Sequence, residues 1–287
     1  MIVEKAFAKI NIGLNIIGRR KDGYHDIDTI MQTIELHDVI KLEKTSGGIS
    51  LVCNKPDLPG DRRNTAWKAA EVFFTRSTID IESNGVRIDI RKNIPAEAGL
   101  GGGSSDAAAV LRAMNKLFGT KYGTDELIEL AAMIGSDVPF LIEGGTARAT
   151  GRGEIMEKLS DFSGINTVIT VPDDCVSTSE AYSLFKNCFN PIHPDIDSLA
   201  ANFTRHNLLS IKNLAGNTFE SLIFPVKPLI EKTKHDILET NPLVCSMTGS
   251  GSAVFGLYDS EKSAYAAFKL LSKKYKTFIT VTTGGIN

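Results

Sequence analysis

The sequence lacks any run of about 18 consecutive apolar residues, the length that a membrane-spanning helix needs. The apolar stretch from Ala6 to Ile17 is interrupted by Lys9, Asn11 and Asn15, and no small-residue cleavage site follows it. It therefore does not have the pattern of a secretory signal. We expect a soluble, cytoplasmic protein without a membrane partner.

Patterned cysteines and histidines are also missing. Cys53, Cys175, Cys188 and Cys245 lie far apart with no C-x-x-C spacing, which argues against a disulfide scaffold and favours a reducing cytosol. His37, His193, His206 and His235 show no spacing typical of a zinc site, and we assign them no role.

An excess of charge of either sign is absent too. The formal net charge is -2 and 23% of the residues are charged, so no summed positive field would attract a nucleic acid. The 287 residues exceed the usual size of one domain and predict two domains. We place the boundary near residue 160, giving domains 1–160 and 161–287.

The apolar pattern mixes helices and strands, so we expect an α+β protein. Alternation predicts strands over 6–16, 39–43, 86–90, 167–171, 253–258 and 277–282. Helical spacing predicts helices over 64–74, 106–118, 125–134 and 260–273, with Gly119 ending the second and Ser260 capping the last.

The most informative segment reads Pro95-Ala-Glu-Ala-Gly-Leu-Gly-Gly-Gly-Ser-Ser-Asp106, between a predicted strand and a predicted helix. Glycine is costly to order, and missing side chains let several backbone N–H groups converge on one anion beside a helix N-terminus. A phosphate site is favoured over a purely structural turn. Ser104 stands where the P-loop requires lysine and where the dinucleotide pattern requires glycine, so neither common motif fits.

This loop resembles the phosphate-binding motif of the GHMP kinases, the superfamily that includes galactokinase, homoserine, mevalonate and phosphomevalonate kinases. Three further segments resemble its 4-diphosphocytidyl-2-C-methyl-D-erythritol kinase family. They are Ala8-Lys-Ile-Asn-Ile-Gly-Leu with Gly18-Arg-Arg-Lys-Asp-Gly-Tyr-His25 and Met31-Gln-Thr-Ile, Gly135-Ser-Asp-Val-Pro-Phe140, and Met247-Thr-Gly-Ser-Gly-Ser-Ala-Val-Phe255. One departure is Phe140-Leu141, where the family usually has two aromatic residues.

The resemblance implies a two-domain GHMP-kinase fold, with a ribosomal-protein-like N-terminal domain and a ferredoxin-like C-terminal domain. It implies ATP with Mg²⁺ and phosphorylation of the 2-hydroxyl of 4-diphosphocytidyl-2-C-methyl-D-erythritol, a small-molecule substrate in the non-mevalonate synthesis of isoprenoid precursors. We expect a monomer or weak homodimer.

The resemblance also assigns residues. Lys9 and Asp137 fall on the catalytic pair, Asn11 and Thr178 on substrate contacts, and Tyr24, His25 and Tyr182 on the group that holds the cytosine ring. The ATP-phosphate site comprises Pro95, Ala96, Glu97, Ala98, Gly99, Leu100, Gly101, Gly102, Gly103, Ser104 and Ser105. The metal ligand is not assigned, with Ser105 and Asp106 as candidates.

Each assignment has a structural alternative. Asp137 precedes Pro139 and could serve only as a helix N-cap, and Lys9 could be a lysine of an edge strand in solvent. Tyr24 and His25 could belong to an ordinary surface loop, and the neighbouring basic residues to a solvated turn. The alternative functions are another GHMP kinase, of mevalonate or homoserine type, and a non-catalytic nucleotide- or RNA-binding module.

Overall fold

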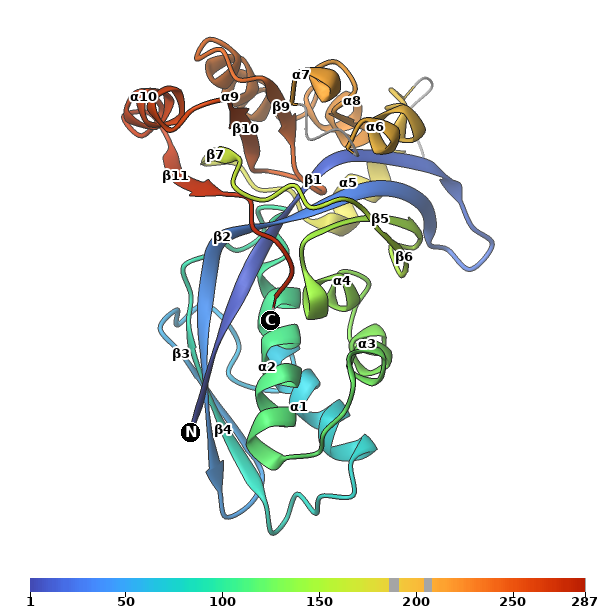
Figure 1. Cartoon of the computed structure of the whole chain (residues 1–287), viewed down its shortest axis with the longest axis vertical. Coiled ribbons are helices and arrows are strands. Elements are labelled where there is room, and N and C mark those ends of the chain that lie inside the picture. The colour runs from blue at the N-terminus through green and yellow to red at the C-terminus, as the bar shows by residue number, and fades with distance from the viewer. Residues whose placement is uncertain (186–190, 204–207, 287) are drawn as a thin grey trace.

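The computed structural model describes residues 1–185, 191–203 and 208–286, arranged as two bodies stacked along the long axis (Figure 1). Cys188 and His206 lie outside the described residues. The strands are β1 Ile2–Arg19, β2 His25–Thr45, β3 Ile49–Cys53, β4 Gly85–Arg91, β5 Thr146–Gly151, β6 Ile155–Lys158, β7 Asn166–Val171, β8 Gly216–Asn217, β9 Val244–Met247, β10 Val254–Tyr258 and β11 Lys276–Val281. The helices are α1 Thr65–Arg76, α2 Gly102–Phe118, α3 Thr124–Ala132, α4 Val138–Glu143, α5 Thr178–Phe185, α6 Ile196–Phe203, α7 Leu208–Ile211, α8 Thr218–Ile223, α9 Pro228–Leu238 and α10 Glu261–Leu271.

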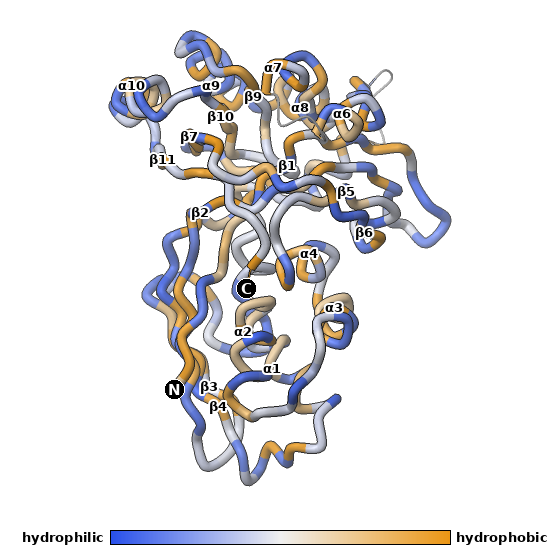
Figure 2. The backbone as a smooth tube through the Cα atoms, in the orientation of Figure 1, coloured by the Kyte–Doolittle hydropathy of each residue, from blue (hydrophilic) through white to orange (hydrophobic). Residues whose placement is uncertain are grey.

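A long antiparallel hairpin, β1 with β2, organises the molecule. The other edge of β2 pairs with β5 along 27–32 and with β4 along 39–45, so both edges of β2 are hydrogen-bonded. Figure 2 shows the hairpin turn as hydrophilic, with hydrophobic residues along the strands behind it. The sequence predicted only residues 39–43 as strand here. It missed the first half of β2 because polar side chains on that half are paired inside the protein, as Asp28 is with Arg148 and Gln32 with Thr146.

The N-terminal body packs α1 to α4 against the long-stranded sheet (Figure 1). The apolar face of α2 is buried as its spacing predicted, and Gly119 ends the helix in the left-handed conformation. The start of α2 was predicted wrongly, since the helix begins at Gly102 and not at residue 106. Glycine has low helix propensity, so a propensity argument places the start too late.

The C-terminal body contains the antiparallel sheet β11-β7-β10-β9, with α9 and α10 packed against it. Taken in chain order, its strands stand 4-1-3-2 in a β-α-β-β-α-β arrangement, which is the predicted ferredoxin-like topology. Ser260 caps α10 as predicted, while β9 was not predicted.

Two segments of the second half of the chain join the first sheet. β8 pairs in parallel with Gly13 and Leu14 of β1, and residues 282–286 run back along β2 and α4. Within that return, the Thr283 N–H donates to the Thr33 carbonyl and the Ile286 N–H to the Glu143 carbonyl, which ends α4. Residues beyond the predicted boundary near residue 160 therefore also contact the N-terminal body. In the described part of the chain, no helix is both long and apolar enough to cross a membrane.

Candidate active site

One cavity of about 1010 Å³ lies between the two bodies. Every site residue predicted from the sequence lines it except Ser105, and residues from β1, the hairpin turn, the turn before α4, α5 and the 248–252 loop share its wall. The structure therefore brings together residues that are up to about 240 positions apart in the chain, as Lys9 and Gly251 are.

The glycine loop, residues 95–105, forms one end of this cavity. Gly99 and Gly101 have φ angles of 73° and 71°, which side-chain-bearing residues rarely adopt. A Cβ atom on Gly99 would stand 2.1 Å from the Thr248 carbonyl oxygen, and one on Gly101 would stand 3.0 Å from Cγ of Lys9. Glycine is therefore required here by both conformation and close approach.

The first turn of α2 begins within the glycine loop. Gly101 occupies the N-cap position without a capping side chain, and Gly102 and Gly103 are the first helical residues. The N–H groups of a first helical turn have no partner inside the helix and carry a partial positive charge. This end of the cavity therefore fits a phosphate group held by backbone donors.

Ser105 does not take part in this surface. It is 1% exposed, and its Oγ donates to the Phe7 carbonyl oxygen at 2.5 Å, which ties α2 to β1. The Ser105 hydroxyl proton is therefore not free for a phosphate, contrary to expectation, while Ser105 as a metal ligand stays a prediction. Ser104 is half-buried and lines the cavity.

Lys9 and Asp137 meet beside the glycine loop. Lys9 Nζ lies 3.4 Å from Asp137 Oδ2 and donates to Asn11 Oδ1 at 2.7 Å. Lys9 is 4% exposed, because its side chain packs against the glycine loop: the Lys9 N–H donates to the Leu100 carbonyl at 3.0 Å, and a Cβ on Gly101 would stand 3.0 Å from its Cγ. The alternative of a solvent-exposed edge lysine is wrong.

Asp137 occupies the N-cap position of α4, but its side chain makes no capping hydrogen bond. Its carboxylate is 36% exposed and faces Lys9. A capping role alone therefore does not explain why this carboxylate faces Lys9.

The 248–252 loop closes the cavity against the glycine loop. Thr248 Oγ1 accepts from the Asn11 N–H at 3.0 Å and donates to the Gly99 carbonyl at 3.3 Å, and the Ala253 N–H donates to the Ala98 carbonyl at 3.2 Å. From β8, Asn217 Nδ2 donates to the carbonyls of Met247 and Gly249 at 2.8 Å each.

The far end of the cavity is aromatic. His25 is 8% exposed and stacks on Tyr182 at 4.7 Å between ring centroids, with Phe185 edge-on at 5.5 Å. Tyr24 is 57% exposed, and the guanidinium of Arg152 lies 5.0 Å from its ring centroid. A flat, partly open aromatic surface of this kind can hold a base.

Two polar features border this aromatic end. Burial, with the Asp137 charge as a smaller cause, raises the pKa of Tyr182 to about 12. Thr178 Oγ1 lies 3.2 Å from Ser250 Oγ, which links α5 to the 248–252 loop.

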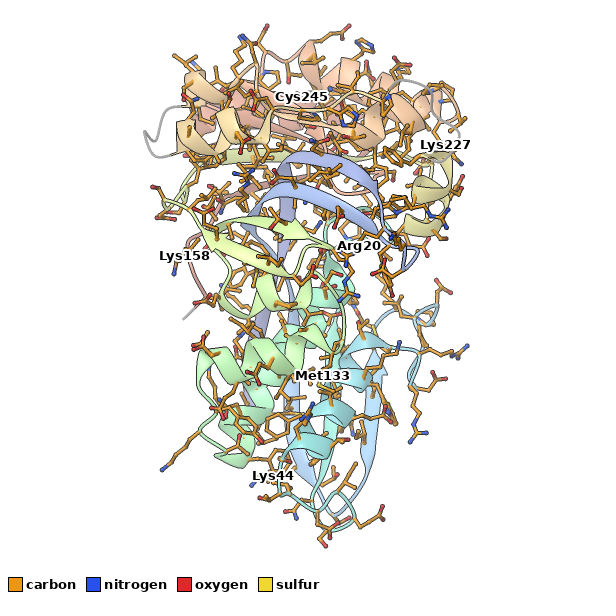
Figure 3. The ribbon with its side chains drawn as sticks, turned by 90° about the vertical axis from the view of Figure 1, so that its right-hand side faces the viewer. Arg20, Lys44, Met133, Lys158, Lys227 and Cys245 are labelled. Carbon is orange, nitrogen blue, oxygen red and sulfur yellow. The ribbon has the colours of Figure 1, made fainter. Side chains whose placement is uncertain are left out.

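The basic turn beside Tyr24 is not uniformly positive. Arg20 bonds to Asp22 at 3.1 Å and to Asp26 at 2.8 Å, so neighbouring carboxylates balance its charge. Figure 3 shows Arg20 at the level where the two bodies meet, far from Lys44 at the end of the N-terminal body.

Sequence reasoning missed a buried charged cluster next to the glycine loop. Lys92 Nζ donates to Asp38 and, at 2.8 Å, to Asp106 Oδ2, and none of the three side chains is more than 5% exposed. A signal for Lys92 was present: the strand alternation that buries Ile88 and Ile90 also points Lys92 inward. Burial, together with the charge of Asp38, raises the pKa of Asp106 to about 8.

Over the described ranges 1–185, 191–203 and 208–286, no group of three or more His, Cys, Asp or Glu residues could hold a metal ion. A site in which the protein supplies most ligands is therefore not built there. A divalent cation held largely by substrate phosphates needs only one or two carboxylates.

Comparison with known proteins identifies relatives over the full length. The model of the GHMP kinases N terminal domain matches residues 64–145, and that of the GHMP kinases C terminal matches residues 199–277. A Clostridium botulinum (strain Eklund 17B / Type B) protein named 4-diphosphocytidyl-2-C-methyl-D-erythritol kinase is 43% identical over 97% of this chain and 99% of its own length.

Solved structures agree with that relationship. A crystal structure of 4-(cytidine 5'-diphospho)-2C-methyl-D-erythritol kinase superposes with a TM-score of 0.84 at 30% identity, covering 99% of this chain and 100% of the other. A homoserine kinase from Cytophaga hutchinsonii reaches a TM-score of 0.75 at 18% identity over 97% and 95% of the two chains. At 18% identity, the likeness to the homoserine kinase shows a shared fold and nothing further.

Proposed function

Because this chain belongs to the GHMP kinases and, within them, to the 4-diphosphocytidyl-2-C-methyl-D-erythritol kinases, we propose that it transfers the γ-phosphoryl group of ATP to the 2-hydroxyl of 4-diphosphocytidyl-2-C-methyl-D-erythritol. It is an ATP-dependent small-molecule kinase of isoprenoid precursor synthesis. The observation that carries the detailed proposal is the Lys9–Asp137 pair, which lies in one cavity between the phosphate-fitting loop and the aromatic end.

In this proposal the glycine loop binds the triphosphate through backbone N–H groups, and Tyr24, His25 and Tyr182 hold the cytosine end of the acceptor. Asn11 and Thr178 contact the acceptor between the two ends. The acceptor hydroxyl is thereby presented to the γ-phosphorus close to Asp137, and positioning of this kind supplies much of the catalysis in phosphoryl transfer.

Asp137 receives the hydroxyl proton as the new P–O bond forms and the bond to ADP breaks. A carboxylate is a weak base, yet the hydroxyl becomes acidic as it attacks, so a late transfer suffices. The buried Lys9 ammonium stabilises negative charge on Asp137 and on the transferring group.

Mg²⁺ is part of the proposal, since ATP-dependent kinases use a divalent cation that bridges and neutralises phosphate oxygens. The carboxylate of Asp106, which lines the cavity next to the start of α2, suits such a cation. We further propose a cytoplasmic monomer or weak homodimer with domains 1–160 and 161–287. The free Cys53, Cys175 and Cys245 are consistent with a reducing compartment.

The test is an ADP-release assay with purified protein across a panel of acceptors. We expect turnover with the cytidine-diphosphate-linked methylerythritol and none with mevalonate, homoserine or free methylerythritol phosphate, and ³¹P NMR of the product should place the new phosphate on the 2-hydroxyl. Preferential turnover of mevalonate or homoserine would refute the proposed acceptor.

A further inference from the structure

We propose that Asp106 Oδ1 is a direct ligand of the divalent cation that accompanies the ATP phosphates. This inference rests on the proposed function, because it requires a nucleotide triphosphate at the glycine loop. It assigns a role to a buried carboxylate that the proton transfer to Asp137 leaves unused.

The position of Asp106 on α2 directs its side chain toward the loop. It lies one turn after Gly102 and Gly103, and helical side chains lean toward the N-terminus. Asp106 lines the cavity, and a Cβ on Gly102 would stand 3.3 Å from Lys92 Nζ, the ammonium that bonds to Asp106.

The two oxygens of Asp106 differ. Oδ2 accepts from Lys92 Nζ at 2.8 Å, whereas Oδ1 is buried and accepts no hydrogen bond from any residue that the structure describes. Asp106 as a whole is 3% exposed. A buried carboxylate oxygen without a partner is unfavourable, and a bound cation is a partner that compensates for its burial.

The pairing within the cluster of Lys92, Asp38 and Asp106 also favours a cation at Asp106. Asp38 is fully satisfied, because its Oδ1 accepts from the N–H groups of Asn93 at 2.5 Å and Ile94 at 2.8 Å while its Oδ2 accepts from Lys92. Two carboxyl groups therefore share one ammonium, and of the two only Asp106 lines the cavity. A triphosphate bound nearby adds further negative charge, so a cation between the phosphates and Asp106 removes a repulsion.

The other acidic residues that line the cavity, Glu97 and Asp137, are less suitable. Glu97 is exposed, so its carboxylate needs no cation to compensate for burial. Asp137 is already paired with Lys9, and metal coordination would compete with its role as proton acceptor. Mg²⁺ sites in kinases commonly use one or two carboxylates plus phosphates and water, which agrees with a single inward-facing carboxylate here.

The experiment titrates Mn²⁺, followed by the EPR signal of the free ion, into protein saturated with a non-hydrolysable ATP analogue. Asp106→Asn keeps the shape of the side chain and leaves Lys92 paired with Asp38, so the fold should persist. We expect Mn²⁺ affinity to fall by at least about tenfold, since even outer partners of metal ligands cost 10- to 100-fold. Affinity for the analogue in EDTA should not fall.

Asp38→Asn is the matched control, because it removes the same charge from the other side of Lys92. It should retain Mn²⁺ affinity close to wild type. Unchanged affinity in Asp106→Asn, or an equal loss in both variants, would overturn the proposal, the latter because it would reveal only a general effect of charge.

A second measurement avoids dependence on that variant. In wild-type protein labelled with [4-¹³C]aspartate, ENDOR should detect a ¹³C coupling to Mn²⁺ that persists in Asp137→Asn. Absence of the coupling, or its loss in Asp137→Asn, would refute Asp106 as the ligand. No acceptor is present in either experiment, so failure of the proposed acceptor specificity would appear separately, in the ADP-release panel.

Discussion

The two ends of the cavity are built in different ways. The phosphate end comes from one continuous segment, residues 95–105, and presents mostly backbone. The aromatic end collects side chains from the hairpin turn and from α5, which are far apart in the chain. Phosphate is common to many ligands and can be held by N–H groups alone, whereas a particular base needs particular side chains.

The largest effect on catalysis is expected from Asp137, which lies between the phosphate end and the aromatic end of the cavity. Asp137→Asn should lower kcat by about a hundredfold or more, the usual size of general-base effects, because the hydroxyl loses its proton acceptor. ADP-release assays at saturating substrates measure this, and the thermal melting curve should stay near wild type.

Asp125→Asn, which removes an exposed carboxylate on α3, is the control for Asp137→Asn and should keep normal turnover. Near-normal kcat in Asp137→Asn would exclude that residue as the proton acceptor. Positioning of the substrates would then be the only role left for this part of the cavity.

The phosphate end should be sensitive to any added side chain. Gly99→Ala places a Cβ against the Thr248 carbonyl in a left-handed conformation, so we expect about 2–3 kcal/mol of lost stability from overpacking and strain, with a raised KM for ATP. Denaturant unfolding and initial-rate kinetics provide the two readouts.

Gly48→Ala is a matched comparison for Gly99→Ala, since Gly48 has a φ of 71° but open space around it. It should lose only about 1 kcal/mol, from the backbone conformation alone. Equal losses in the two variants would show that contact with the 248–252 loop adds nothing.

The aromatic end should respond only in acceptor binding. Tyr24→Ala is expected to weaken binding of the cytidine substrate by about tenfold, because stacking on a base contributes roughly 1–3 kcal/mol, and to leave ATP affinity unchanged. Calorimetric titration of each ligand separates the effects. Equal weakening of both ligands would mean that the hairpin turn supports the whole cavity.

The smallest effect concerns alkaline stability at the aromatic end. The pKa of Tyr182 is raised from 10 to about 12, so the unfolded chain loses this proton before the folded chain does. The contribution of this phenol to the free energy of unfolding is fully present below pH 10 and is lost as the pH rises toward 12. At pH 11 the free energy of unfolding is lower by about 1 kcal/mol.

Tyr182→Phe should flatten the dependence of unfolding free energy on pH between 10 and 12, as measured by denaturant titration. Tyr265→Phe, at an exposed tyrosine on α10, controls for loss of a hydroxyl. A slope unchanged by Tyr182→Phe would mean that this phenol is not held in its neutral form.

Much of this site could be predicted from the sequence because its signals are local. The glycine loop combines an unusual composition with a strand before it and a helix after it, and alternation in β1 placed Lys9 and Asn11 on a shared face. The GHMP-type fold and its ferredoxin-like second half were predicted from the resemblance of these motifs to a known family, and the structure and the relatives agree.

What could not be predicted depends on tertiary partners. The hydroxyl of Ser105 is used by the Phe7 carbonyl across the sheet, and the buried cluster of Lys92 forms only when β2, β4 and α2 meet. The first half of β2 was not predicted as a strand, because its polar side chains are paired inside the protein and interrupt the apolar alternation. In each case the sequence pattern gives the residue's side of an element, but the identity of its partner comes from a distant segment.

The hydrogen bonds between the glycine loop and the 248–252 loop have a mechanical consequence. Any hinge that swung the two bodies apart would break the contacts of Thr248 with Asn11 and Gly99, and that of Ala253 with Ala98, together. These contacts therefore favour a cavity whose shape is set before nucleotide and acceptor bind. Selectivity then arises from the fit to this preset shape, and ordering of the walls consumes little of the binding energy.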